Sequence, residues 1–324
     1  MGRVRAVDGD PLAPVGVRYL TGALRAFVAS PPDAADRVIE KVAVRWESAR
    51  RRGRLPANHA AQQWERDLHA MLGAAWPCPH AQAFAGTWEG VLETMTSGGL
   101  SVGRRNYGDQ DDADPGFARA LWCIVHHLHA QAAIETGVAH GVSSRVMLEA
   151  LREGSGGRLY SIDLPPMLVP QRWSEMAVAV PLELRDRWTL LKGSSRRQLP
   201  DLLRRLGRID LFVHDSRHST RNVHWELSAA WPLLAPGGVV VVDDADVNWG
   251  FELFLRGGDD REPLWCMADD GQRQFAIARK SSHLPPHSPV AGDSSGLGRA
   301  SAGRAQPVSG AHTSLPDQPD EVSR

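Results

Sequence analysis

Three acidic residues and one histidine have the types and spacing needed to bind a cation and to accept a proton. Asp215 follows the apolar run RIDLFVH, and Asp243 and Asp244 follow the run GGVVVV. Carboxylates gathered at one place repel one another, and a divalent cation relieves that repulsion. Oxygen ligands favour Mg²⁺ over softer metals. His218 stands three residues after Asp215, and a histidine can accept a proton near neutral pH.

These four residues also have plainer interpretations. Acidic residues at the ends of buried strands often cap loops, and His218 could cap the helix that follows it. Asp210 opens the fourth predicted strand at the opposite end of the sheet, so we leave it outside the site.

A second stretch, AIETGVAHG at 133–141, combines an acid with two glycines four residues apart. Such a turn lets backbone N–H groups approach a ligand closely. The dinucleotide fingerprint G-x-G-x-x-G has a middle glycine that this stretch lacks. Glu135 would repel a pyrophosphate and attract an ammonium group. The turn at Gly137 and Gly141 therefore favours a cationic ligand over a nicotinamide dinucleotide.

The elements around these residues alternate between strand and helix. Apolar runs predict strands at 132–137, 158–164, 187–193, 208–215 and 237–244, with helices between them at 143–154, 172–180, 195–207 and 219–234. Residues 263–280 read as two strands around an Asp-Asp-Gly turn. The pattern predicts an α/β fold: a doubly wound, mostly parallel seven-stranded sheet, Rossmann-like, with a C-terminal antiparallel hairpin at its edge.

In such a sheet the first and fourth strands are neighbours, and the fifth lies beside the fourth. Ligands bind outside the carboxyl ends of the strands at this point. The fold therefore brings the turn after Glu135 together with Asp215, Asp243 and Asp244.

The chain divides into four predicted parts. Residues 1–14 are expected to be a disordered N-terminus, and 15–114 a helical N-terminal segment that ends in a lid loop at 97–115. Residues 115–280 form the ligand-binding domain. The Ser-, Gly- and Pro-rich residues 281–324 are expected to be a disordered tail.

The 133–144 stretch resembles the first motif of class I S-adenosylmethionine-dependent methyltransferases, in which an acid precedes G-x-x-x-G. The resemblance implies that Glu135 lies near the amino group of the cofactor. It also implies that Gly137 and Gly141 let the backbone approach the cofactor. Ser143, with Ser144, is expected to cap the next helix.

Two later stretches match the same family in order. The resemblance places Asp163, at the end of YSID, where the family's acid accepts the ribose hydroxyls. It places Ser194, in LLKGSS, in the region that frames the adenine. Relatives often have Asp at that position, so a charged acceptor for the adenine amino group is in doubt.

The spacing of Asp215, His218 and the Asp243-Asp244 pair resembles that of metal-dependent O-methyltransferases. The match is closer to the macrolide sugar O-methyltransferases than to the catechol type. The resemblance implies S-adenosyl-L-methionine and Mg²⁺ as cofactors and His218 as general base. Asp215 then takes part in both metal binding and catalysis. The implied acceptor is a hydroxyl of a small molecule, with a sugar as first choice and a phenol as second.

The composition excludes several other classes. The 324-residue chain has a net charge of −1, which argues against a nucleic-acid partner. No apolar run approaches the roughly 18 residues of a membrane span, so we expect a cytoplasmic protein. An NAD-dependent oxidoreductase and a non-catalytic cofactor-binding module remain as alternatives.

The cysteines and a histidine cluster read as structural residues. Cys78, Cys123 and Cys266 are an odd number without metal-like spacing, and this pattern is typical of reduced, cytosolic proteins. His126, His127 and His129 lie on one predicted helix, where partial burial is the expected role.

Overall fold

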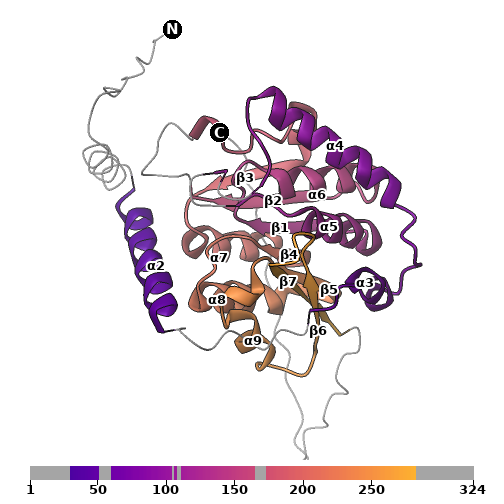
Figure 1. Ribbon diagram of the computed structural model, residues 1–324. Coiled ribbons are helices and arrows are strands. Elements are labelled where there is room, and N and C mark those ends of the chain that lie inside the picture. Colours follow the sequence, from indigo (N-terminus) through magenta and orange to yellow (C-terminus); the bar gives the residue numbers. More distant parts are fainter. Residues whose placement is uncertain (1–29, 51–59, 104–105, 108–110, 165–172, 282–324) are drawn as a thin grey trace, which may run out of the picture. The chain divides into compact units, whose positions relative to one another are not determined.

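The computed structural model describes residues 30–50, 60–103, 106–107, 111–164 and 173–281 (Figure 1). The predicted disordered N-terminus at 1–14 and the predicted tail beyond residue 281 lie outside these ranges.

A single seven-stranded sheet forms the centre of the fold, with the strand order β3-β2-β1-β4-β5-β7-β6. Strands β1 to β5 pair in parallel, and β7 runs antiparallel to both β5 and β6. The prediction of a doubly wound sheet with an antiparallel hairpin at its edge is confirmed. The strands are β1 (Ala132–Thr136), β2 (Arg158–Asp163), β3 (Trp188–Lys192), β4 (Ile209–His214), β5 (Leu234–Val242), β6 (Arg261–Met267) and β7 (Gln274–Lys280).

Helices cover both faces of the sheet (Figure 1). One face packs against α3 (Trp64–Leu72), α4 (Ala81–Ser97), α5 (Pro115–Leu128) and α6 (Val142–Glu153). The other face packs against α7 (Ser195–Leu206), α8 (Thr220–Ala230) and α9 (Gly250–Leu255). The N-terminal helix α2 (Pro31–Arg50) contacts α8. Short 3-10 helices are η2 (Leu182–Arg187), η3 (Trp231–Leu233) and η4 (Ala245–Val247).

The helix predicted at 172–180 is wrong for its described part. Trp173 and Ser174 are in 3-10 conformation, and residues 175–180 form turns and a bend beside the β1–α6 loop. The backbone N–H of Ala177 donates to the carbonyl of Ala139, and that of Ala179 donates to the carbonyl of His140. These long-range bonds replace the local bonds that a helix would make.

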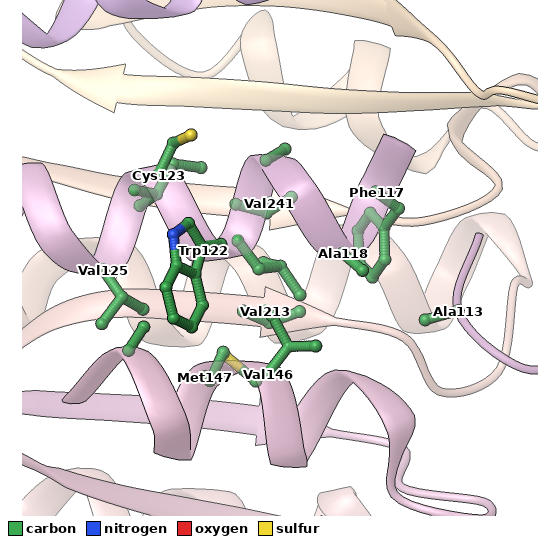
Figure 2. Close-up of a cluster of buried hydrophobic side chains, with 14 of the residues drawn as sticks. Ala113, Phe117, Ala118, Trp122, Cys123, Val125, Val146, Met147, Val213 and Val241 are labelled. Atoms are coloured by element: carbon green, nitrogen blue, oxygen red, sulfur yellow. The ribbon is translucent and has the colours of Figure 1, made fainter. Parts of the chain in front are cut away.

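Side-chain alternation along the strands builds two separate cores. On β4, Leu211 and Val213 face the α5 and α6 side, while Phe212 faces the α7 and α8 side. Figure 2 shows the first core, where Val213 meets Trp122 of α5 and Met147 of α6. Burial on both faces explains why the strands read as continuous apolar runs.

The N-terminal helices join the edge of the same sheet. Ala61 forms a parallel bridge with Cys266 of β6, and the Trp64 indole N–H donates to the carbonyl of Met267 at 3.0 Å. Of the helices that the structure describes, none is both long and apolar enough to cross a membrane.

Candidate functional site

A cavity of about 350 Å³ opens at the carboxyl ends of the parallel strands. Its wall contains Gly137 after β1, Asp163 at the end of β2, Ser194 after β3 and Asp215 after β4. The Asp243-Asp244 pair after β5 and His218 complete this side of the wall. These seven predicted residues therefore come together at the predicted edge of the sheet, whereas Glu135, Gly141 and Ser143 do not line the cavity.

The turn after β1 is shaped by a close approach of two loops. Gly137 has φ +89°, and a Cβ at this position would lie 1.9 Å from the carbonyl oxygen of Asp215. Only glycine fits here, because any side chain would collide with the backbone of the next loop. Gly141 has φ +86°, and a Cβ there would lie 3.0 Å from the Val180 side chain and 3.1 Å from Cα of Ala177, which is a milder contact.

Glu135 lies beneath the turn, fully buried, and is not part of the cavity wall. Its carboxylate accepts hydrogen bonds from the hydroxyls of Ser143 (2.6 Å), Ser144 (2.5 Å) and Ser161 (2.7 Å). Burial raises the pKa of Glu135 to about 7, although the three hydroxyls oppose the rise. The expectation that Ser143 and Ser144 cap α6 is wrong. The N-cap is Gly141, and the serine hydroxyls instead serve the buried acid.

Asp163 links the end of β2 to the glycine turn. Its Oδ2 accepts from the backbone N–H groups of Val138 (3.2 Å) and Ala139 (3.1 Å). Burial raises the pKa of this carboxyl above its ordinary value, although its hydrogen bonds and Arg37 oppose the rise. Asp163 therefore both lines the cavity and holds the turn in place.

Ser194 is held by α2, which the sequence analysis did not connect with the site. The Ser194 hydroxyl donates to Asp36 at 2.7 Å, and its backbone N–H donates to Asp33 at 3.2 Å. Asp36, Arg37 and Glu40 of α2 line the cavity. The spacing of Asp33, Asp36 and Glu40 places three acids on one helical face. This spacing was the only sequence feature that could have connected α2 with the site.

An acidic cluster with one histidine lies in the cavity wall. Ligand atoms of Asp215, His218 and Asp243 all lie within 4.8 Å of one another. Asp244 has φ +49°, and its Oδ2 lies 3.8 Å from Nε2 of His218. Burial, and then the charge of Asp243, raises the pKa of Asp215 well above its ordinary value. Burial and the charge of Asp244 do the same for Asp243.

His218 sits outside the helix that follows it. The N-cap of α8 is Ser219, whose hydroxyl accepts from the backbone N–H of Asn222 at 3.1 Å and donates to Glu40 at 2.8 Å. The capping interpretation of His218 is therefore wrong. Burial lowers the pKa of His218, and Asp244 opposes this effect.

A buried Glu226 supports the end of β4 from below, and the sequence offered no signal for it. The carboxylate accepts from Nδ1 of His214 (2.7 Å), the Thr136 hydroxyl (2.6 Å) and the Asn222 amide (3.0 Å). Burial raises the pKa of Glu226, but the charge of His214 and the hydrogen bonds from His214 and Thr136 outweigh burial and lower the pKa to about 2. The network joins β1, β4 and α8 directly behind Asp215.

Residues 134–245 match a protein family described as a methyltransferase domain. The match spans β1 to β5 and thus the strand ends that line the cavity. No curated protein sequence matches the chain.

Solved structures of O-methyltransferases are similar to this chain. One is from Bacillus cereus with S-adenosylhomocysteine bound (18% identity, 67% of this chain and 98% of that chain, TM-score 0.46). A second is TomG from Streptomyces achromogenes, involved in tomaymycin synthesis and solved with S-adenosylmethionine (20% identity, 60% of this chain and 89% of that chain, TM-score 0.45). A third is a putative caffeoyl-CoA O-methyltransferase from Staphylococcus aureus (13% identity, 68% of this chain and 99% of that chain, TM-score 0.45).

Proposed function

We propose that this chain transfers a methyl group from S-adenosylmethionine to a hydroxyl oxygen of a small molecule, with Mg²⁺ bound beside the cofactor, because residues 134–245 match a family described as a methyltransferase domain. The observation that carries this proposal is the acidic cavity at the strand ends of the matched domain. The family match favours this function over an NAD-dependent oxidoreductase.

Several contacts support the cofactor site. Gly137 lines the cavity and admits no side chain, and Asp163 lies beside it with a carboxylate that can accept ribose hydroxyls. Ser194 lies on the same wall, where the adenine is expected. Glu135 is expected near the cofactor amino group, with contact made directly or through water. Gly141 and Ser143 complete the expected cofactor-binding set.

The acidic cluster fits a divalent cation. Burial and the charge of Asp243 raise the pKa of Asp215, and burial and the charge of Asp244 raise the pKa of Asp243; a bound cation relieves this kind of repulsion. Oδ1 of Asp244 and Nδ1 of His218 are buried and have no hydrogen-bond partner among the described residues. Asp215, Asp243 and Asp244 would hold Mg²⁺, whose charge lowers the pKa of an alcohol bound beside it.

His218 supplies the proton acceptor. Its lowered pKa keeps the imidazole neutral at pH 7, so a ring nitrogen can take the hydroxyl proton. Bound S-adenosylmethionine would supply the methyl group: the oxygen would bond to the methyl carbon, and the sulfur would keep the electron pair of the broken bond. The products are a methyl ether, S-adenosylhomocysteine and protonated His218. The remaining contribution of the chain is to position the two reactants in line.

A pair of variants tests the cation site. Asp243→Asn should weaken Mn²⁺ or Mg²⁺ binding, measured by calorimetry, while affinity for S-adenosylmethionine stays largely intact. Asp246→Asn is the matched control, because Asp246 lies three residues after Asp243, accepts the backbone N–H of Gln274 at 3.1 Å and lies outside the cavity wall. Equal metal affinity in both variants would remove Asp243 from the metal site.

The acceptor and the metal requirement need a turnover assay. A panel of sugars and phenols, followed by release of S-adenosylhomocysteine, should give activity with a hydroxyl acceptor. EDTA should abolish this activity, and Mg²⁺ should restore it. Full activity in EDTA would refute the metal requirement and leave His218 as the only base.

A further inference from the structure

A second cluster of metal-binding side chains lies outside the cavity, on the α3 and α5 side of the sheet. It contains His69 of α3, Cys78 in the connection before α4, and Cys123 and His127 of α5. His69, Cys78 and Cys123 are 1%, 8% and 4% exposed, so water hardly reaches the group. Figure 2 shows the sulfur of Cys123 directed away from Val146 and Met147.

Two distances in this cluster, both to the Cys78 sulfur, are close to those of tetrahedral zinc coordination. The sulfur atoms of Cys78 and Cys123 are 3.4 Å apart, and Nε2 of His127 lies 3.7 Å from the Cys78 sulfur. The ligand atoms of His69, Cys78 and Cys123 lie within 4.8 Å of one another. With Zn–S near 2.3 Å and Zn–N near 2.0 Å, a tetrahedron places sulfur atoms about 3.8 Å apart and sulfur and nitrogen about 3.6 Å apart.

The orientation of His69 points to a ligand that the protein itself does not supply. Its Nδ1 lies 2.6 Å from the carbonyl oxygen of Glu65. A carbonyl can only accept, so Nδ1 carries the proton and Nε2 carries the lone pair. That Nε2 is buried and has no hydrogen-bond partner within the described part of the chain. A zinc-binding histidine has this same arrangement, with its second nitrogen donating to a carbonyl.

We propose that His69, Cys78, Cys123 and His127 bind one Zn²⁺ ion in a structural site. Two thiolates and two imidazoles fill all four tetrahedral positions, which leaves none for a substrate. Each thiol releases its proton to solvent when the metal binds, and nothing is oxidised or reduced. The ion would fasten α3 and the start of α4 to α5, which packs on the sheet.

The site changes our interpretation of the cysteines and histidines from the sequence. Cys123 is part of the core, but its sulfur also faces Cys78. His127 belongs to the cluster, while His126 stacks on His80 at 4.1 Å between ring centres. The four residues come from three separate segments of the chain, so no short sequence motif could have predicted the cluster.

Metal analysis of the full chain tests the proposal directly. Protein expressed with zinc in the medium and dialysed without chelator should contain about one Zn²⁺ per chain by plasma mass spectrometry. Cys78→Ser and Cys123→Ser should lower this content to near zero. Cys266→Ser is the matched control, since Cys266 is also a buried free thiol but lies in β6, outside the cluster, and it should keep the zinc.

A second measurement covers the case in which the serine variants fail to fold. Metal-free wild-type protein titrated with Co²⁺ should show thiolate-to-cobalt absorption. The Asp243→Asn variant should show the same absorption, because the cavity cluster around Asp243 contains no thiolate and does not contribute to this signal. Wild-type protein that holds neither Zn²⁺ nor Co²⁺ and presents three titratable thiols would overturn the proposal. A Cys78–Cys123 disulfide in freshly purified protein would overturn it as well.

Discussion

Replacing Asp163 by alanine removes a carboxylate that serves both the turn and the cavity. Its Oδ2 accepts two backbone N–H groups, from Val138 at 3.2 Å and Ala139 at 3.1 Å. We expect the ribose hydroxyls of the cofactor to use the same carboxylate. Loss of hydrogen bonds to a charged acceptor should weaken cofactor binding by about 1–3 kcal/mol. This corresponds to a roughly 5- to 150-fold rise in Kd.

Calorimetric titration with S-adenosylhomocysteine measures this change, and Asp210→Ala provides a matched control. Oδ2 of Asp210 also accepts two backbone N–H groups, from Gln131 at 2.8 Å and Ala132 at 3.1 Å. Asp210 lies at the amino end of β4, at the edge of the sheet opposite the cavity. Both variants should lose thermal stability, but only Asp163→Ala should lose affinity.

Two outcomes would refute this reasoning. Unchanged affinity in a folded Asp163→Ala protein would remove Asp163 from the cofactor site. Equal losses of affinity in the Asp163 and Asp210 variants would mean that general loosening of the sheet, and not a contact at the cavity, controls binding.

The remaining predictions concern the turn, the buried carboxylate and the base. Gly137→Ala should lower the Tm and the cofactor affinity strongly, because its methyl would meet the Asp215 carbonyl at 1.9 Å. The control Gly73→Ala, at a position with φ +69° and open space, should lower the free energy of unfolding by only about 1–2 kcal/mol. Similar losses of unfolding free energy for the two variants in urea would contradict the collision at Gly137. Glu226 has a pKa lowered from 4.5 to about 2, so its ionised form stabilises the fold fully above pH 4.5 and loses that effect as the pH falls towards 2. The difference in unfolding free energy between wild type and Glu226→Gln should therefore shrink by about 3 kcal/mol over this range, and a constant difference would refute the assignment. His218→Ala should bind cofactor and metal but lose about 10²- to 10⁴-fold in kcat; full activity would exclude it as the base.

The sequence was sufficient for the parts of the fold that depend on local patterns. The strands β4 and β5 are mostly apolar runs, and the acid that follows each of them marks the strand end. Because parallel strands share one carboxyl edge, Asp215, His218 and Asp243 could be expected together, and their ligand atoms do lie within 4.8 Å.

The parts that could not be predicted depend on contacts between distant segments. Residues 173–180 do not form the predicted α-helix, because two of their backbone N–H groups donate to carbonyls of the β1–α6 loop. Asp36 reaches Ser194 only because α2 packs beside the cavity. The three hydroxyls on Glu135 include Ser161, from a neighbouring strand. The cluster around Cys78 has the same origin, since its members are remote in sequence.

The most direct test of the central claim is binding of radiolabelled S-adenosylmethionine and of a nicotinamide dinucleotide to the purified full chain. The cavity with Glu135 beneath its glycine turn, and with no middle glycine at residue 139, should bind S-adenosylmethionine saturably and the dinucleotide not at all. Saturable binding of the dinucleotide without binding of S-adenosylmethionine would contradict the account.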